Sequence, residues 1–215
     1  MDVTWLGHGC FRLRGRGAAV VTDPYPPSIG LKLQRMDADV VTISHEHENH
    51  SYVQAVREAY EIRGPGEYEV SGVSVVGVPT FHDGERGAKR GPNTVYMIEI
   101  DDVRVCHLGD LGHKLEDAEA EAVSSPDVLL VPVGGRTSMN AAQAAEVVRQ
   151  LEPRFVIPMH YAIPGLKADL DTIERFLKEM GVAAAEPQPK LSVQKSAGDY
   201  DTKLVVLEPK VEPRV

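Results

Sequence analysis

Three histidines lie within six residues of this sequence. His45, His47 and His50 occupy the segment HEHENH, which directly follows the apolar run 40–43. Neutral imidazole is a common metal ligand, and in an extended segment the side chains at positions i and i+2 lie on one face. His45 and His47 can therefore bind one ion together, and His50 can turn toward a neighbouring position. Histidines in a polar loop can also be merely solvated, but an average loop seldom holds three. The segment predicts a metal site.

Other side chains of the same chemistry follow predicted strands further along the chain. His82 follows a strand at 75–78, Asp110 follows 103–108, and His160 follows 155–158. Loops beyond strand ends gather into sites on a rigid scaffold. We therefore expect these side chains to join the histidine cluster. A divalent metal activates water and polarises a substrate oxygen, so a serine nucleophile is not required, and the sequence has no G-x-S-x-G motif.

Composition limits the classes of protein. The chain has 215 residues, 42% of them hydrophobic, which fits one globular domain with an ample core. The net charge of −9 makes nucleic acid a poor partner and leaves a small molecule as the expected one. Two cysteines without a CxxC motif exclude a disulfide framework and a thiolate zinc site. The sequence shows no signal peptide and no run that could span a membrane, so we expect a cytoplasmic location.

The hydrophobic pattern predicts strands followed by helices in both halves. A helix of about 51–60 should follow the histidine cluster, and a helix with Thr137, Ser138 or Asn140 as N-cap should run to about residue 151. Other predicted strands cover 2–6, 10–14, 18–22, 39–43, 68–70, 73–78, 94–100, 128–133 and 203–207, and other predicted helices cover 115–123 and a segment from 169. An α/β layered sandwich is the natural packing of this mixture.

Several strings resemble the metallo-β-lactamase superfamily, and within it the small metal-dependent hydrolases related to ascorbate-6-phosphate lactonase. These strings are TWLGHGCF, VTDP, HEHENH, GPGEYEV, CHLGDLGH, VPVGG and IPMHY, and together they cover most of residues 1–165. The resemblance implies one domain over 1–215 with an αββα four-layer sandwich and a metal cleft at one edge of two sheets. The segment 186–215 has no sharp motif and either completes a sheet edge or packs on a partner.

The resemblance also implies roles for particular residues. His45, His47 and His82 would hold the first metal, and His50, Asp110 and His160 the second, with Asp110 bridging the two. One or two divalent ions are expected, with zinc favoured and manganese, iron or nickel also fitting the donors. Asp23 matches an early aspartate that orients a ligand histidine, and His107 either does likewise or is simply buried.

Asn49 stands where the family usually has an aspartate. A carboxylate there would bind the second metal and accept a hydrogen bond from the attacking water. An amide oxygen can coordinate but cannot take a proton. Asn49 and Asp110 are thus the candidate catalytic positions. The amide predicts a weaker second metal and a more positive centre that favours an anion, although a tolerated variant or a weakened enzyme are alternatives.

Other polar residues are candidates for substrate contacts. His8, in the turn GHGC, either lines the cleft or is an ordinary turn histidine. Arg136, after Gly134 and Gly135, could meet an anion, as could the loop residues Arg86, Lys89 and Arg90. His113 is not expected to bind metal.

The sequence thus favours a metal-dependent hydrolase that uses a metal-bound hydroxide on a small anionic lactone, ester or phosphoester. One alternative is a non-catalytic metal-binding or ligand-binding module weakened at Asn49. A less favoured alternative is a phosphodiesterase acting on nucleic acid, against which the acidic charge counts.

Overall fold

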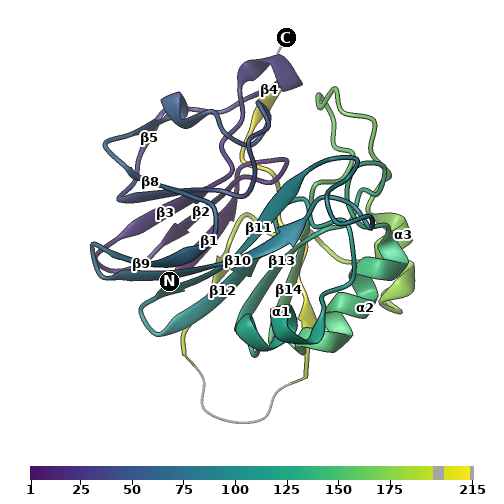
Figure 1. Cartoon of the computed structure of the whole chain (residues 1–215). Coiled ribbons are helices and arrows are strands. Elements are labelled where there is room, and N and C mark those ends of the chain that lie inside the picture. The colour runs from purple at the N-terminus through teal and green to yellow at the C-terminus, as the bar shows by residue number, and fades with distance from the viewer. Residues whose placement is uncertain (196–200, 214–215) are drawn as a thin grey trace.

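Two β-sheets pack face to face in the computed structural model, which describes residues 1–195 and 201–213 (Figure 1). The first sheet has the order β15-β1-β2-β3-β6-β8, and the second has the order β16-β14-β13-β12-β11-β10-β9. The strands of the first sheet are β1 (Asp2–Trp5), β2 (Phe11–Arg14), β3 (Ala19–Thr22), β6 (Val40–Ile43), β8 (Tyr60–Arg63) and β15 (Leu191–Ser192). Those of the second are β9 (Gly66–Val70), β10 (Val73–Phe81), β11 (Pro92–Ile100), β12 (Val103–His107), β13 (Val128–Pro132), β14 (Phe155–Met159) and β16 (Lys203–Leu204).

Strand direction brings the loops of the candidate site together. Hairpin pairing makes β1 run parallel to β3, and β3, β6 and β8 then pair in parallel. In the second sheet β10 and β12 run the same way on either side of β11, and β12, β13 and β14 pair in parallel. The carboxyl ends of parallel strands meet at one edge of a sheet. Apart from His107, which is the last residue of β12, the candidate residues from His8 to His160 lie in loops that follow these carboxyl ends.

The main core fills the space between the sheets and continues under the helices. Every residue of β6 and of β13 is buried, as expected for parallel strands covered on both faces. The helices α1 (Asp117–Ala122), α2 (Ala141–Leu151) and α3 (Glu174–Glu179) lie against the outer face of the second sheet (Figure 1). Asn140 begins α2 and accepts a hydrogen bond from the Gln143 backbone N–H at 3.0 Å, which confirms it as the N-cap.

The outer face of the first sheet is covered differently. A second cluster that includes Val21, Val41 and Tyr25 lies there under loops and two 3-10 turns, η1 (Pro27–Ile29) and η2 (Val53–Ala55). Short strand pairs join β4 (Leu31–Lys32) to β17 (Glu212–Pro213) and β5 (Met36–Asp37) to β7 (Val56–Arg57). In the described part of the chain, this outer layer therefore contains no α-helix.

The prediction of a helix at about 51–60 is wrong, because strands use several of these residues. Val56 and Arg57 pair with β5, and Tyr60 already pairs with Val40 at the start of β8. Too few residues remain for a helix, and strand pairing overrides the local helical pattern. The helix predicted from residue 169 is shorter, beginning at Glu174.

The C-terminal segment completes sheet edges, which was one of its two expected roles. β15 pairs with β1 at an edge of the first sheet, and β16 pairs with β14 at an edge of the second. β16 is shorter than the predicted strand 203–207.

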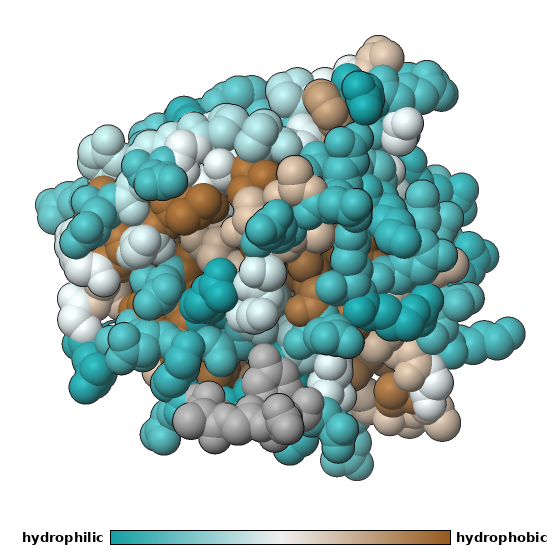
Figure 2. All heavy atoms as spheres, turned by 60° about the horizontal axis from the view of Figure 1, so that its bottom comes forward, coloured by the Kyte–Doolittle hydropathy of each residue, from teal (hydrophilic) through white to brown (hydrophobic). Residues whose placement is uncertain are grey.

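None of the described helices is long and apolar enough to cross a membrane. Figure 2 shows a face on which hydrophilic residues surround separate hydrophobic areas.

Candidate metal centre

The loops at the carboxyl ends of the strands enclose a cleft of about 390 Å³. Both sheets contribute to its walls, so residues far apart in the sequence meet there. The lining residues that carry polar side chains are His8, His47, Asn49, His50, His82, Arg90, Asp110, Arg136, Thr137, His160 and Asp169.

Asp110 lies at the centre of the histidines. Its Oδ2 atom is 3.1 Å from Nε2 of His82 and 3.5 Å from Nε2 of His50. Its Oδ1 atom is 3.2 Å from Nε2 of His160. The two carboxylate oxygens thus face different histidines, which is the arrangement that a carboxylate needs in order to lie between two ions. The backbone N–H of Asp110 donates to Oδ1 of Asn93 at 3.0 Å, which fixes the loop.

Asp23 and Ser44 determine which ring nitrogens face the cleft. The buried Asp23 carboxylate accepts from the Ser44 backbone N–H at 2.8 Å, from the Ser44 hydroxyl at 2.5 Å and from Nδ1 of His50 at 2.9 Å. Because the Ser44 hydroxyl donates to Asp23, its oxygen is free to accept from Nδ1 of His45, 2.9 Å away. An ionised carboxylate has no proton to give, so His45 and His50 both carry their proton on Nδ1. Their Nε2 atoms are left without that proton, and Nε2 of His50 lies 3.5 Å from Oδ2 of Asp110.

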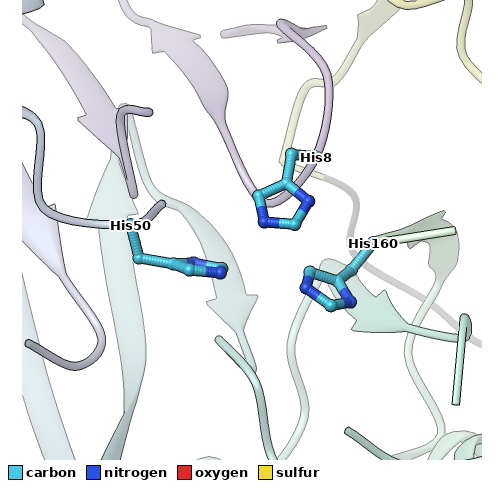
Figure 3. Close-up of side chains that lie close together, drawn as sticks. All are labelled: His8, His50 and His160. Atoms are coloured by element: carbon cyan, nitrogen blue, oxygen red, sulfur yellow. The ribbon is translucent and has the colours of Figure 1, made fainter. Parts of the chain in front are cut away.

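His8, His50 and His160 form a second group of rings (Figure 3). The ring centroid of His8 lies 4.3 Å from the ring centroid of His160 and 4.7 Å from that of His50. The ring centroids of His50 and His160 lie 5.6 Å apart. The three residues come from three separate loops, and their rings turn toward one common point.

The donor atoms in the cleft fit a divalent cation. Buried side-chain atoms without a hydrogen-bond partner among the described residues include both ring nitrogens of His8, Nε2 of His45 and of His82, Nδ1 of His160 and Oδ1 of Asp110. Such atoms are rare in proteins because desolvation without a partner is costly. Three groups, His8–His50–His160, Asp23–His45–His50 and His45–His82–Asp110, each place one donor atom per residue within 4.8 Å of the others. A cation would supply a partner for one nitrogen of each ring and for the Asp110 oxygen.

Burial keeps most of these imidazoles in the form that binds metal. It lowers the pKa of His45 to about 3 and that of His160 to about 4, and it lowers the pKa of His8 well below its usual value. Burial also acts to lower the pKa of His50, but Asp110 and Asp23 together outweigh it and raise that pKa. Burial acts to raise the pKa of Asp110, but His160 and His50 outweigh it and hold that pKa well below the usual value.

Two of the predicted ligands lie at the mouth of the cleft. His47 is exposed, and its ring centroid lies 6.0 Å from that of His45 and 6.3 Å from that of His50. Its Nδ1 atom accepts from the Asn49 backbone N–H at 3.3 Å. Asn49 is half-buried and lines the cleft. Both residues therefore stand beside the cluster, and their ligand roles stay predictions.

The remaining histidines have structural contacts. His107 is fully buried, and its Nε2 donates to the carbonyl of Gly9 at 2.9 Å, so it anchors the turn that carries His8. His113 accepts the backbone N–H of Phe81 through Nε2 at 3.1 Å and is not part of the cleft lining.

Of the four basic candidates, two face the cleft. Arg90 and Arg136 line it, and Nη2 of Arg90 donates to the Arg136 carbonyl at 2.9 Å. Nη2 of Arg136 also lies 3.7 Å from Oδ1 of Asp171. Arg86 instead pairs with Glu116, and Lys89 with Glu85, away from the lining residues.

Sequence reasoning missed three residues that support the site. Ser44 links Asp23 to His45, and its place between a strand and the histidine cluster was an available signal. Asn93 holds Asp110 and has no such signal. Asp83 accepts hydrogen bonds from four backbone N–H groups, at Glu85, Gly87, Lys89 and Arg90, and so shapes the loop that presents Arg90.

Fold and site define the class of this protein. The sequence profile of the β-lactamase superfamily domain matches residues 2–160. The chain therefore belongs to that superfamily, and the metallo-β-lactamase-like α/β sandwich expected from the sequence is confirmed.

Particular relatives are named metal-dependent hydrolases. A proposed Zn-dependent hydrolase of the metallo-β-lactamase superfamily from Thermotoga maritima, known from a crystal structure, is 36% identical, with a TM-score of 0.78 over 96% of this chain and 99% of that one. A UPF0173 metal-dependent hydrolase of Korarchaeum cryptofilum is 30% identical over 85% of this chain and 93% of its own length. One from Methanopyrus kandleri is 28% identical over 85% of this chain and 94% of its own length.

Proposed function

We propose that this protein is a metal-dependent hydrolase of a small anionic lactone, ester or phosphoester, with one or two divalent ions, most simply zinc. The observation that carries the proposal is the approach of three histidine Nε2 atoms, those of His50, His82 and His160, to within 3.5 Å of the Asp110 carboxylate inside a cleft. Membership of a superfamily whose similar members are named metal-dependent hydrolases supports it. The lactonase-related branch stays part of this proposal.

The ligands divide into two groups. His45, His82 and Asp110 would hold the first ion, with His47 completing the group from the mouth of the cleft. His50 and His160, with Asp110 between the groups, would hold the second. A divalent ion bound there would lower the pKa of a coordinated water and polarise a substrate oxygen. Zinc suits the set because neutral imidazole and a single carboxylate are donors that it prefers.

The chain's own residues prepare the centre for that chemistry. Asp23 and Ser44 keep the Nδ1 protons of His50 and His45 away from the cleft, so that Nε2 of each is free. Asn49 offers an amide oxygen at the mouth, which can accept a hydrogen bond but cannot remove a proton. Asp110, whose pKa is held well below its usual value, is a poor proton acceptor, so proton transfer would fall to solvent.

Charge favours an anionic substrate. The guanidinium groups of Arg90 and Arg136 line the same cleft as the candidate ligands. Arg136 is only loosely paired, since its contacts with Asp171 and Asp169 are 3.7 Å and 4.0 Å. A guanidinium with unused donors can bind a carboxylate or a phosphate in two-point fashion.

The test combines metal content with turnover. Protein purified without an affinity tag should contain one or two zinc equivalents by elemental analysis, and it should hydrolyse at least one member of a panel of lactones, carboxyl esters and phosphate esters. Asp110→Asn should lose both properties, while His113→Gln should keep them. Bound metal without turnover would refute the hydrolase and leave a metal-binding module. Absence of metal after reconstitution with zinc or manganese would refute the metal centre itself.

A further inference from the structure

His8 has surroundings that an ordinary turn residue does not need. Its side chain is 2% exposed, and neither of its ring nitrogens has a hydrogen-bond partner in the described chain. Leaving a buried polar atom unpaired costs about 1–3 kcal/mol. A phenylalanine or leucine would avoid that cost, so the imidazole indicates a ligand that supplies the missing partner.

The backbone holds this ring in place. The carbonyl of His8 accepts from the indole N–H of Trp5 at 3.0 Å and from the backbone N–H of His160 at 3.1 Å. His8 has a φ of 53°, in the left-handed region that few residues other than glycine adopt, asparagine, aspartate and histidine more often than the rest. The position of the ring is therefore set by the fold and by its bond to His160.

The neighbouring glycine allows the close approach to His50. A Cβ atom on Gly9 would lie 3.2 Å from Cε1 of His50, which is tighter than ordinary van der Waals contact. With glycine at that position the turn can bring the His8 ring to 4.7 Å from the His50 ring.

We propose that His8 is a ligand of the second metal position together with His50, His160 and Asp110, supplying the donor that Asn49 provides poorly. One donor nitrogen from each histidine lies within 4.8 Å of the other two (Figure 3). Two nitrogens bound to one zinc at about 2.0–2.1 Å are at most about 4 Å apart, so small side-chain movements are sufficient. The inference rests on the proposed metal centre and assigns His8 to the ion rather than to the substrate.

The variant His8→Asn tests this assignment. Asparagine tolerates a positive φ, so the turn is kept, while its shorter side chain withdraws the donor from the cluster. His113→Asn is the matched control, since His113 lies outside the cleft lining. His8→Gln is a second variant of greater length in case the first fails to fold.

The measurement is the zinc affinity of each site, by chelator competition on untagged protein, with metal equivalents counted by elemental analysis. We expect two ions in the wild type and in His113→Asn. In His8→Asn the weaker site should lose more than about 100-fold in affinity, because removing a group that only orients a ligand costs about 10–100-fold. The tighter site should be unchanged. With cobalt, the visible absorption of the second ion should change as well.

Unchanged affinity at both sites in His8→Asn, with or without a rise in KM, would overturn the inference and leave the proposed hydrolase intact. A wild type that binds a single ion would also overturn it. A wild type that binds no metal would refute the proposed function and this inference together, so the two failures are distinguishable.

Discussion

Replacing Asp23 by asparagine should weaken metal binding without touching a ligand. The Oδ2 atom of Asp23 accepts from Nδ1 of His50 at 2.9 Å and from the Ser44 hydroxyl at 2.5 Å. In Asp23→Asn the amide oxygen can still accept from the Ser44 backbone N–H, but the NH₂ group would face both former donors. His50 must then accept on Nδ1 and carry its proton on Nε2. The Ser44 hydroxyl becomes free to donate to His45, which shifts that ring in the same way.

The size of the effect follows from these contacts. A ring protonated on Nε2 cannot bind an ion through that atom, and removing a partner that orients a ligand costs about 10–100-fold in metal affinity. Asp23 acts on His50 directly and on His45 through Ser44. The binding free energy of each of the two ions should therefore become less favourable by about 1.4–2.8 kcal/mol. Ser44→Ala removes the hydroxyl that links Asp23 to His45 but leaves the bond between Asp23 and His50, so it should weaken binding of the first ion alone.

The assay is chelator competition for zinc near pH 7.5, with the tautomers of His45 and His50 followed by their imidazole nitrogen NMR shifts. Asp127→Asn is the control, because it changes a buried aspartate that accepts the Arg104 backbone N–H at 2.9 Å and does not line the cleft. It should leave affinity unchanged. The reasoning fails if Asp23→Asn binds zinc like the wild type, or if both rings keep their Nδ1 protons in the variant.

Three further outcomes follow from the same site. Asn49→Asp adds a negative charge at the mouth of the cleft, so the zinc affinity of the second site should rise about tenfold in a titration. An affinity equal to that of the wild type would contradict this. Arg136→Ala should raise KM for an anionic substrate about tenfold at unchanged kcat, whereas Arg86→Ala, which breaks a pair with Glu116, should not. The metal-free protein should lose stability as pH falls from about 6.5 to about 4, because the unfolded state protonates His160 first, and its folded pKa is about 4. Between pH 7 and pH 4.5 that histidine alone accounts for a loss of about 2 kcal/mol, which denaturant unfolding at the two pH values measures. Equal unfolding free energies would refute the assigned burial.

The sequence predicted those parts of the fold that repeat a strong local pattern. Apolar runs such as 40–43 and 128–133 became buried parallel strands, and Asn140 began a helix as expected. The segment 51–60 failed because its fate depends on pairing with Met36 and Val40, which local periodicity does not contain. Long-range pairing overrode local propensity there.

The site was predictable to the extent that ligands follow strand ends. His45, His50, His82, Asp110 and His160 were all expected, and the structure brings them together. The contact of Asp23 with His50 was also expected. The sequence did not show that the ring nitrogens of His8 lack hydrogen-bond partners, because an exposed turn histidine and a buried ligand can have the same local sequence.

Under the proposed function, charge gives a reason for an acidic chain to favour a small anion over nucleic acid. The chain carries a net charge of −9, which repels a polyanion that must extend over the surface. A small anion inside the cleft instead lies beside Arg90, Arg136 and the metal position, while surface charges further away than about 8 Å are screened at physiological salt. If His8 is the replacement donor for Asn49, as proposed, Asp110 is the carboxylate among the described residues that would lie between the two groups of ligands. A metal centre built in this way keeps one more unit of positive charge than its carboxylate-bearing counterpart. The same exchange that weakens the second ion thus strengthens the attraction for an anionic substrate.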